Sequence, residues 1–311
     1  MLTVAHQLKE SVPAPQRRFN VSLEDDATIR VRVYGNGPRL ILSHGNGLAI
    51  DAYAPFWERL IPRYQVVVFD FRHHGLSSPY QGPRRNWPQF IGDFGRIIGA
   101  IDDELGPAPS VGVFHSMSAL TALIHASENE TNWRALVAFE PPTPPRLDHP
   151  ESQPFIDMHR DLAEGAARRR ESFARIEDLV MSLRRRHSFS RINDQTLYGL
   201  AAATLRWNPD RSVFDLACAR EFESETFRLR NVGDAWGRVT SVKLPVCIVA
   251  GISALDENHC LANVARCVAT DGGFQFRDVQ DATHFLQLER PQKCAAIVEE
   301  FVAKVLVNTW G

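Results

Sequence analysis

Short, almost entirely apolar runs that alternate with amphipathic stretches constrain the fold of this chain most. Branched apolar residues fill the runs at 40–43, 66–69, 111–114, 135–139, 245–250 and 274–279. Strands that are buried on both faces of a parallel sheet have this composition. Helical stretches are predicted at 53–61, 90–105, 117–126 and 291–305, and a hairpin is predicted at 19–34. The alternation predicts an α/β fold with a doubly wound, mostly parallel sheet.

The alternation stops between residues 139 and 245, where the chain becomes charged, arginine-rich and helical in pattern. Pro141, Pro142, Pro144 and Pro145 open this segment and favour a stiff exit from the sheet. We interpret the segment as a helical cap that is inserted after the sixth strand. The predicted domains are therefore a core of residues 1–140 and 240–311 and a cap of residues 141–239.

The charge balance and the cysteines limit the classes of partner and compartment. A net charge of −2 gives no electrostatic reason to expect nucleic acid or a membrane surface, which leaves small molecules as partners. The 5 cysteines are odd in number and form no C-x-x-C pair, as in a reduced protein. Without a visible signal peptide or an apolar run of about 20 residues, a cytoplasmic protein is expected. The sequence does not indicate the oligomeric state.

Chemically active side chains follow three of the predicted strands directly. Ser116 separates an apolar run from a helix-forming stretch, Glu140 follows the next run, and His284 follows the last one. Open α/β sheets bind ligands outside the carboxyl ends of their strands. A hydroxyl, a carboxylate and an imidazole are thus expected at one edge of the sheet.

Four motifs in this order resemble the α/β-hydrolase superfamily, in its capped serine-hydrolase branch. They are His44-Gly45-Asn46, the segment from Asp70 to Ser77, His115-Ser116-Met117, and His284-Phe285. The resemblance implies hydrolysis of an ester, a thioester or a related acyl bond. It also implies an oxyanion hole made of the backbone amides of Asn46 and Met117.

A serine hydroxyl needs a base, and the base needs a carboxylate that fixes its tautomer. Ser116 is predicted to be the nucleophile and His284 the base; the alternative for Ser116 is an ordinary helix N-cap. The other ten histidines are interpreted as loop residues without partners. Asp70 and Arg72 are expected to brace their loop.

Two positions compete for the acid. The family usually places it three residues after Gly251, where this chain has Ala254; Asp256 and Glu257 follow a little later. Glu140 directly follows a strand and precedes a stiff proline-rich turn, and some capped relatives carry their acid there. Glu140 is preferred to Asp256.

Two features depart from the expected pattern or carry an open alternative. Phe114 and Ser118 stand where the motif G-x-S-x-G has glycines, so the turn must tolerate a large ring or the site is degenerate. The arginine runs 168–170 and 184–186 are interpreted as solvated helix faces. Their alternative is recognition of an acidic substrate, such as the phosphates of a CoA thioester.

The sequence thus predicts a serine hydrolase that cleaves a small acyl substrate through a Ser-acid-His triad and an acyl-enzyme. A carbon–carbon bond hydrolase with the same triad is one alternative, and a non-catalytic small-molecule-binding protein with this fold is the other. No cofactor and no metal are expected, since the pairs His73-His74 and His259-Cys260 lack the spacing of a zinc site. The identity of the substrate is not readable.

Overall fold

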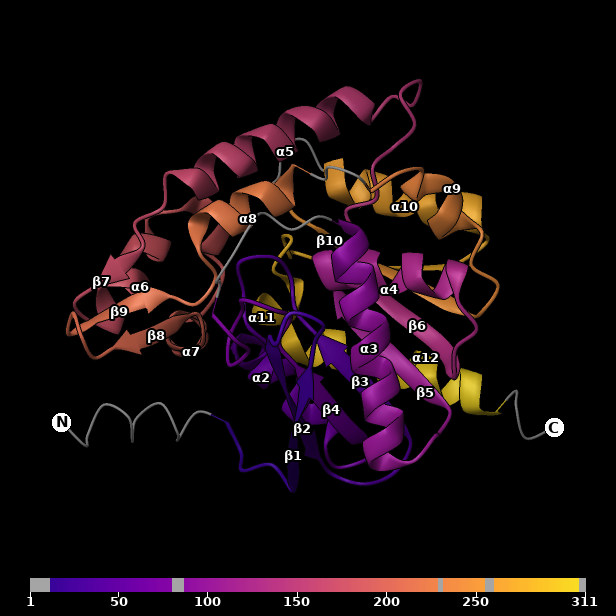
Figure 1. The fold of residues 1–311 in the computed structure, drawn as a ribbon. Helices are drawn as coiled ribbons and strands as arrows, with labels where there is room; N and C mark the ends of the chain where they lie inside the picture. The colour runs from indigo at the N-terminus through magenta and orange to yellow at the C-terminus, as the bar shows by residue number, and fades with distance from the viewer. Residues whose placement is uncertain (1–11, 80–86, 229–231, 255–259, 308–311) are drawn as a thin grey trace.

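The computed structural model describes residues 12–79, 87–228, 232–254 and 260–307. Eight strands form the main sheet, in the order β1-β2-β4-β3-β5-β6-β10-β11 (Figure 1). The pairs β1–β2 and β2–β4 are antiparallel, and all other neighbours are parallel. The strands are β1 (Arg17–Ser22), β2 (Thr28–Tyr34), β3 (Arg39–Ser43), β4 (Gln65–Phe69), β5 (Ser110–His115), β6 (Trp133–Phe139), β10 (Val246–Ile252) and β11 (Gln275–Gln280). The predicted doubly wound sheet is confirmed.

Helices cover both faces of this sheet. One face carries α3 (Trp87–Leu105), α4 (Met117–Glu128), α9 (Ala235–Thr240) and α10 (Cys260–Gly272). The other face carries α2 (Ala54–Trp57), α11 (Leu286–Glu289) and α12 (Pro291–Val307). The single helix predicted at 53–61 is instead three short turns, α2 between the 3₁₀ turns η1 (Ile50–Tyr53) and η2 (Glu58–Leu60). No helix in the described ranges has the length and hydrophobicity needed to span a membrane.

Burial on two faces explains the apolar strand composition. In β3, Leu40 and Leu42 pack into the core beneath α12, while Ile41 packs into the core beneath α3 and α4. Successive strand side chains point to opposite faces, so a strand between two helical layers needs apolar residues at every position.

The segment between β6 and β10 lies over one edge of the sheet, with α5 (Ser152–Ala167) and α8 (Arg220–Phe227) packed side by side (Figure 1). It also contains α6 (Ile176–Arg184), η3 (His187–Phe189) and α7 (Asp194–Ala203). A three-stranded antiparallel sheet is the unpredicted part, in the order β7 (Ser172–Phe173), β9 (Val213–Leu216) and β8 (Leu205–Asn208). The insertion is therefore not purely helical. We call residues 141–239 the insertion, and its exact boundaries remain a prediction.

Candidate active site

Ser116 lies in a strained turn between β5 and α4. Its backbone has φ 53° and ψ −118°, a conformation that non-glycine residues seldom adopt and that is maintained at functional sites by surrounding contacts. The Ser116 amide donates to the carbonyl oxygen of Phe139 at 2.8 Å, which ties the turn to the end of β6. The Ser116 hydroxyl makes no capping hydrogen bond to α4, so the N-cap alternative is not supported.

Phe114 fits behind this turn because its ring points into the core. The ring is 1% exposed and packs edge-on against Phe94 and Trp133. Gly112 makes the space, since a Cβ atom there would lie 2.4 Å from Cε2 of Phe114. Ser118 is accommodated by hydrogen bonds of its hydroxyl to the backbone of His115. The departures from the glycine motif therefore leave the turn intact.

We expect Gly112→Ala to lower the free energy of unfolding by about 1–3 kcal/mol, because the added methyl group overpacks the core. It would meet both Phe114 and Leu136, at 2.4 and 2.6 Å. Gly99→Ala is the control: this exposed helical glycine has no atom within 4 Å of the added Cβ, and alanine there should stabilise α3. Urea unfolding of both variants measures the difference. If Gly112→Ala and Gly99→Ala had equal free energies of unfolding, the Phe114 ring would not depend on the absence of a side chain at position 112.

His284 and Glu140 contact each other directly. Nδ1 of His284 lies 2.6 Å from Oε2 of Glu140, and Oε1 of Glu140 accepts a hydrogen bond from the Gly251 amide at 2.7 Å. Glu140 follows β6 with φ 41°, and its side chain reaches past the end of β10 to the loop after β11. Glycine is required at 251 because a Cβ atom there would lie 2.4 Å from the carbonyl oxygen of Thr283.

The structure describes Glu140 but not the two acidic residues that compete with it for the role of the triad acid. Ala254 ends a described range, whereas Asp256 and Glu257 lie outside the described residues. The contact with His284 therefore favours Glu140, and the assignment of the acid remains a prediction that mutagenesis decides.

Two backbone amides near Ser116 are available to a ligand. Gly45 and Gly47 donate their amides to Tyr53 Oη and His74 Nε2, at 3.2 and 3.1 Å. By contrast, within the described part of the chain the amides of Asn46 and Met117 donate no hydrogen bond, and both residues line the same cavity as Ser116. Free amides at a helix N-terminus and in an adjacent loop are the donors that an oxyanion requires.

A buried hydrogen-bonded chain that the sequence did not indicate joins the Asn46 loop to His284. Tyr53 Oη accepts from the Gly45 amide and lies 2.7 Å from Nδ1 of His115. Nε2 of His115 lies 2.9 Å from the carbonyl oxygen of His284. Since a carbonyl only accepts, Nε2 carries the proton and Nδ1 accepts from Tyr53. Burial lowers the pKa of His115 well below its usual value, so this ring is neutral.

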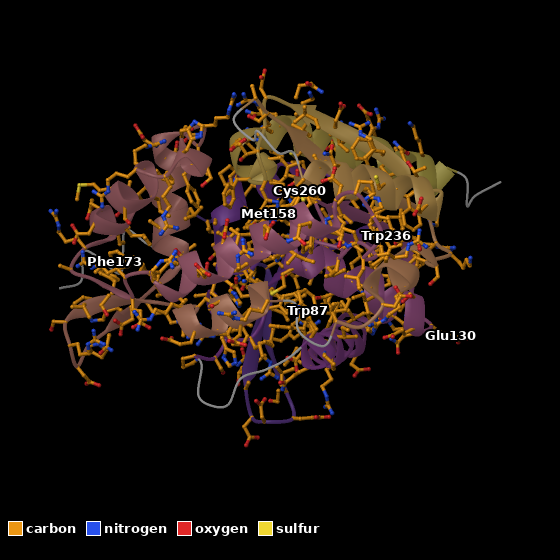
Figure 2. The ribbon with its side chains drawn as sticks, turned by 90° about the horizontal axis from the view of Figure 1, so that it is seen from above. Trp87, Glu130, Met158, Phe173, Trp236 and Cys260 are labelled. Carbon is orange, nitrogen blue, oxygen red and sulfur yellow. The ribbon has the colours of Figure 1, made fainter. Side chains whose placement is uncertain are left out.

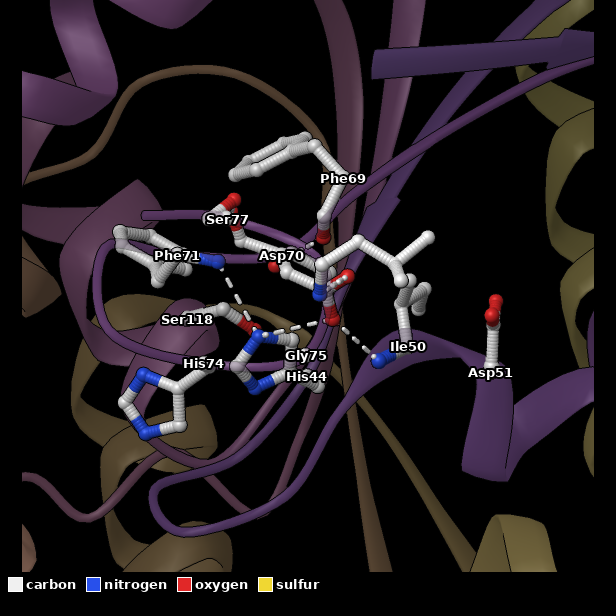
Figure 3. A network of polar contacts seen from close by, with 12 residues as sticks. His44, Ile50, Asp51, Phe69, Asp70, Phe71, His74, Gly75, Ser77 and Ser118 are labelled. Atoms are coloured by element: carbon white, nitrogen blue, oxygen red, sulfur yellow. Dashed lines mark hydrogen bonds and ion pairs between the residues drawn. The ribbon is translucent and has the colours of Figure 1, made fainter. Parts of the chain in front are cut away.

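A second polar network braces the same loop from the side of β4 (Figure 3). The carboxylate of Asp70 accepts from the amides of Ile50 and Leu76, at 2.7 and 3.0 Å. Nε2 of His44 accepts from the Phe71 amide at 3.1 Å. Asp70 thus braces its loop, as expected.

Arg72 and three histidines are also held by specific partners. Arg72 pairs with Asp25 and Asp93. The interpretation of the remaining histidines as partnerless is wrong for His44, His74 and His115, whose buried rings are hydrogen-bonded. It is also wrong for His149 and His159, each of which has one hydrogen-bonded ring nitrogen.

A cavity of about 910 Å³ lies between the sheet edge and the insertion, and Ser116, His284, Asn46 and Met117 all line it. Trp87 of α3, Met158 of α5 and Cys260 of α10 contribute to its walls, and all three are labelled in Figure 2. Phe189 of the insertion stacks on Phe285, at 4.5 Å between ring centroids. No group of three or more metal-binding side chains is arranged to hold an ion among the residues that the structure describes.

The fold and this site define the class of protein. Residues 40–297 match the model of the alpha/beta hydrolase family, and the chain belongs to that family. The pimeloyl-[acyl-carrier protein] methyl ester esterase of Xanthomonas campestris pv. campestris is 30% identical over 156 residues, 49% of this chain and 57% of that protein. Protein phosphatase methylesterase 1 of Homo sapiens is 30% identical over 128 residues, 38% of this chain and 33% of that protein.

Solved structures share the fold at low identity. E-2-(acetamidomethylene)succinate hydrolase superposes with a TM-score of 0.72 at 21% identity, covering 92% of this chain and 99% of that chain. The thioesterase domain from the curacin biosynthetic pathway superposes with a TM-score of 0.71 at 18% identity, covering 91% and 99%. The chain spans 57% and 33% of the two curated relatives, so they bear on family membership more than on a shared substrate.

Proposed function

We propose that this protein is a serine hydrolase that cleaves an ester of a small molecule through an acyl-enzyme on Ser116. The observation that carries the proposal is the contact of His284 with Glu140 beside a cavity that also exposes Ser116 and two free amides. The names of the curated relatives, both methyl ester hydrolases, favour an oxygen ester over a thioester.

The proposed mechanism assigns one task to each group. Oγ of Ser116 attacks the acyl carbonyl carbon while Nε2 of His284 takes the hydroxyl proton. Glu140 accepts the Nδ1–H hydrogen bond and stabilises the imidazolium that forms. The amides of Asn46 and Met117 donate to the oxyanion, and His284 then returns the proton to the leaving alcohol. Water, activated by the same histidine, attacks the acyl-enzyme and releases the acid.

A fluorophosphonate probe tests this proposal. We expect one label per chain, on the peptide that contains Ser116, and protection from labelling by methyl or 4-nitrophenyl esters that the protein hydrolyses. Heat-denatured protein is the control for non-specific labelling. A folded protein that binds acyl esters saturably but neither reacts with the probe nor turns the esters over would be a ligand-binding protein instead, and the proposal would fail.

A further inference from the structure

Two arginines from the two arginine runs face the same cavity as Ser116. Arg169 and Arg186 line it, whereas the other four arginines of the runs 168–170 and 184–186 do not. The interpretation of both runs as solvated faces is therefore wrong for Arg169, whose side chain is largely buried, whereas Arg186 is exposed and also lines the cavity. They lie 17 residues apart in the sequence, on either side of β7 and α6, and the fold brings them to one wall.

Arg169 has a fixed partner. Its guanidinium forms an ion pair with the Glu223 carboxylate, and both side chains are largely buried. That carboxylate packs on Gly47, where a Cβ atom would lie 2.5 Å from Oε1 of Glu223. The Asn46 side chain also donates to the Glu223 carbonyl oxygen at 2.9 Å. The ion pair is thus attached to the loop that presents the free Asn46 amide.

Arg186 has no such partner. Among the described residues, no carboxylate lies within ion-pair distance of its guanidinium and no acceptor binds it. Burial and the charge of Arg169 lower the pKa of Arg186, and the charge of Glu223 opposes this. The single charge of Glu223 is matched by Arg169, so Arg186 leaves one positive charge uncompensated at this wall.

The other charged residues of the cavity do not compensate Arg186. Asp157 and Asp161 of α5 both pair with Arg160, and their side chains are 42% and 74% exposed, so solvent screens them. His159 is held neutral, since burial lowers its pKa to about 4. Arg186 is itself exposed at the cavity wall, and its unpaired guanidinium presents a planar fork of N–H donors that matches a carboxylate.

We infer that the substrate carries a carboxylate, which Arg186 binds with Arg169 beside it, so that the enzyme hydrolyses esters of anionic acyl groups. This inference rests on the proposed hydrolase function for its substrate, but the anion site itself can be measured without catalysis. Glu223 holds Arg169 in place and limits the local positive charge to one, which favours a single carboxylate over a polyphosphate.

Paired substrates test the inference. The 4-nitrophenyl half-esters of succinate, glutarate and adipate are compared with the same compounds methylated on the free carboxylate. We expect at least one half-ester to exceed its methylated partner in kcat/KM by tenfold or more. In Arg186→Gln this ratio should fall about 10- to 100-fold, mainly through KM, as for the loss of a charged hydrogen bond. Arg185→Gln, at an exposed neighbour outside the cavity lining, should keep the wild-type ratio.

Binding to Ser116→Ala protein separates the two proposals. Calorimetric titration with succinate, glutarate and adipate should show binding that Arg186→Gln weakens by the same factor. If such binding occurs while wild-type protein hydrolyses no ester, the anion site stands and the hydrolase proposal fails. If both members of every pair are hydrolysed equally, or Arg186→Gln leaves every ratio and affinity unchanged, the anion site is overturned while the hydrolase proposal stands.

Discussion

Ser116→Ala is expected to lower kcat for ester hydrolysis by about 10⁶-fold, the loss that follows removal of a serine nucleophile. The remaining rate would come from the Asn46 and Met117 amides and from substrate binding alone. The fold should be retained, because the Ser116 hydroxyl does not cap α4 and the backbone bond to Phe139 is independent of the side chain. Steady-state hydrolysis of a 4-nitrophenyl ester measures the loss, with circular dichroism to verify folding.

Ser118→Ala is the matched control two residues away. The Ser118 hydroxyl is fully buried and, among the described residues, forms hydrogen bonds only with the backbone of His115, at 3.0 and 2.9 Å. Its removal should lower the free energy of unfolding by about 1–3 kcal/mol. We expect kcat to stay within tenfold of wild type. Wild-type turnover in Ser116→Ala, or an equal loss in both variants, would contradict the role of Ser116 as nucleophile.

The main sheet could be predicted because its signal is local. The run at 66–69 is apolar at each position, and β4 is buried on both faces in the structure. The small sheet of the insertion carries no such signal: β7 has two residues and β8 has four, with mixed burial. Strands this short have no measurable periodicity, and only their partners in space define them.

The sequence also predicts where a strand ends, but it does not predict which side chains meet across the sheet. Glu140 and His284 each follow a strand, yet they are 144 residues apart, and their contact depends on the order β6-β10-β11. Tyr53 and His115 are harder still, because Tyr53 belongs to no motif and His115 enters the motif His115-Ser116-Met117 only as the neighbour of Ser116. Their signal is only that two polar side chains are buried and must find partners for their hydrogen-bonding atoms.

Glu140→Gln is expected to lower kcat by about 10⁴-fold with KM near its wild-type value, because the substitution reverses the tautomer of His284. The Gly251 amide donates to Oε1 of Glu140, so the glutamine oxygen must stay there to accept it. The glutamine NH₂ group then faces Nδ1 of His284, which becomes an acceptor. The proton moves to Nε2, and the ring can no longer take the proton of Ser116.

Glu289→Gln is the control that distinguishes the change of the His284 tautomer from the mere loss of a buried carboxylate. Glu289 accepts from the amide and the hydroxyl of Thr283, at 2.7 and 2.6 Å, and braces the same loop without contacting the His284 ring. We expect it to reduce stability while kcat falls less than tenfold. Asp256→Asn, made in parallel, should keep kcat near wild type. If Asp256→Asn abolished turnover and Glu140→Gln did not, the carboxylate that orients His284 would come from the loop after β10, and the contact with Glu140 would be structural.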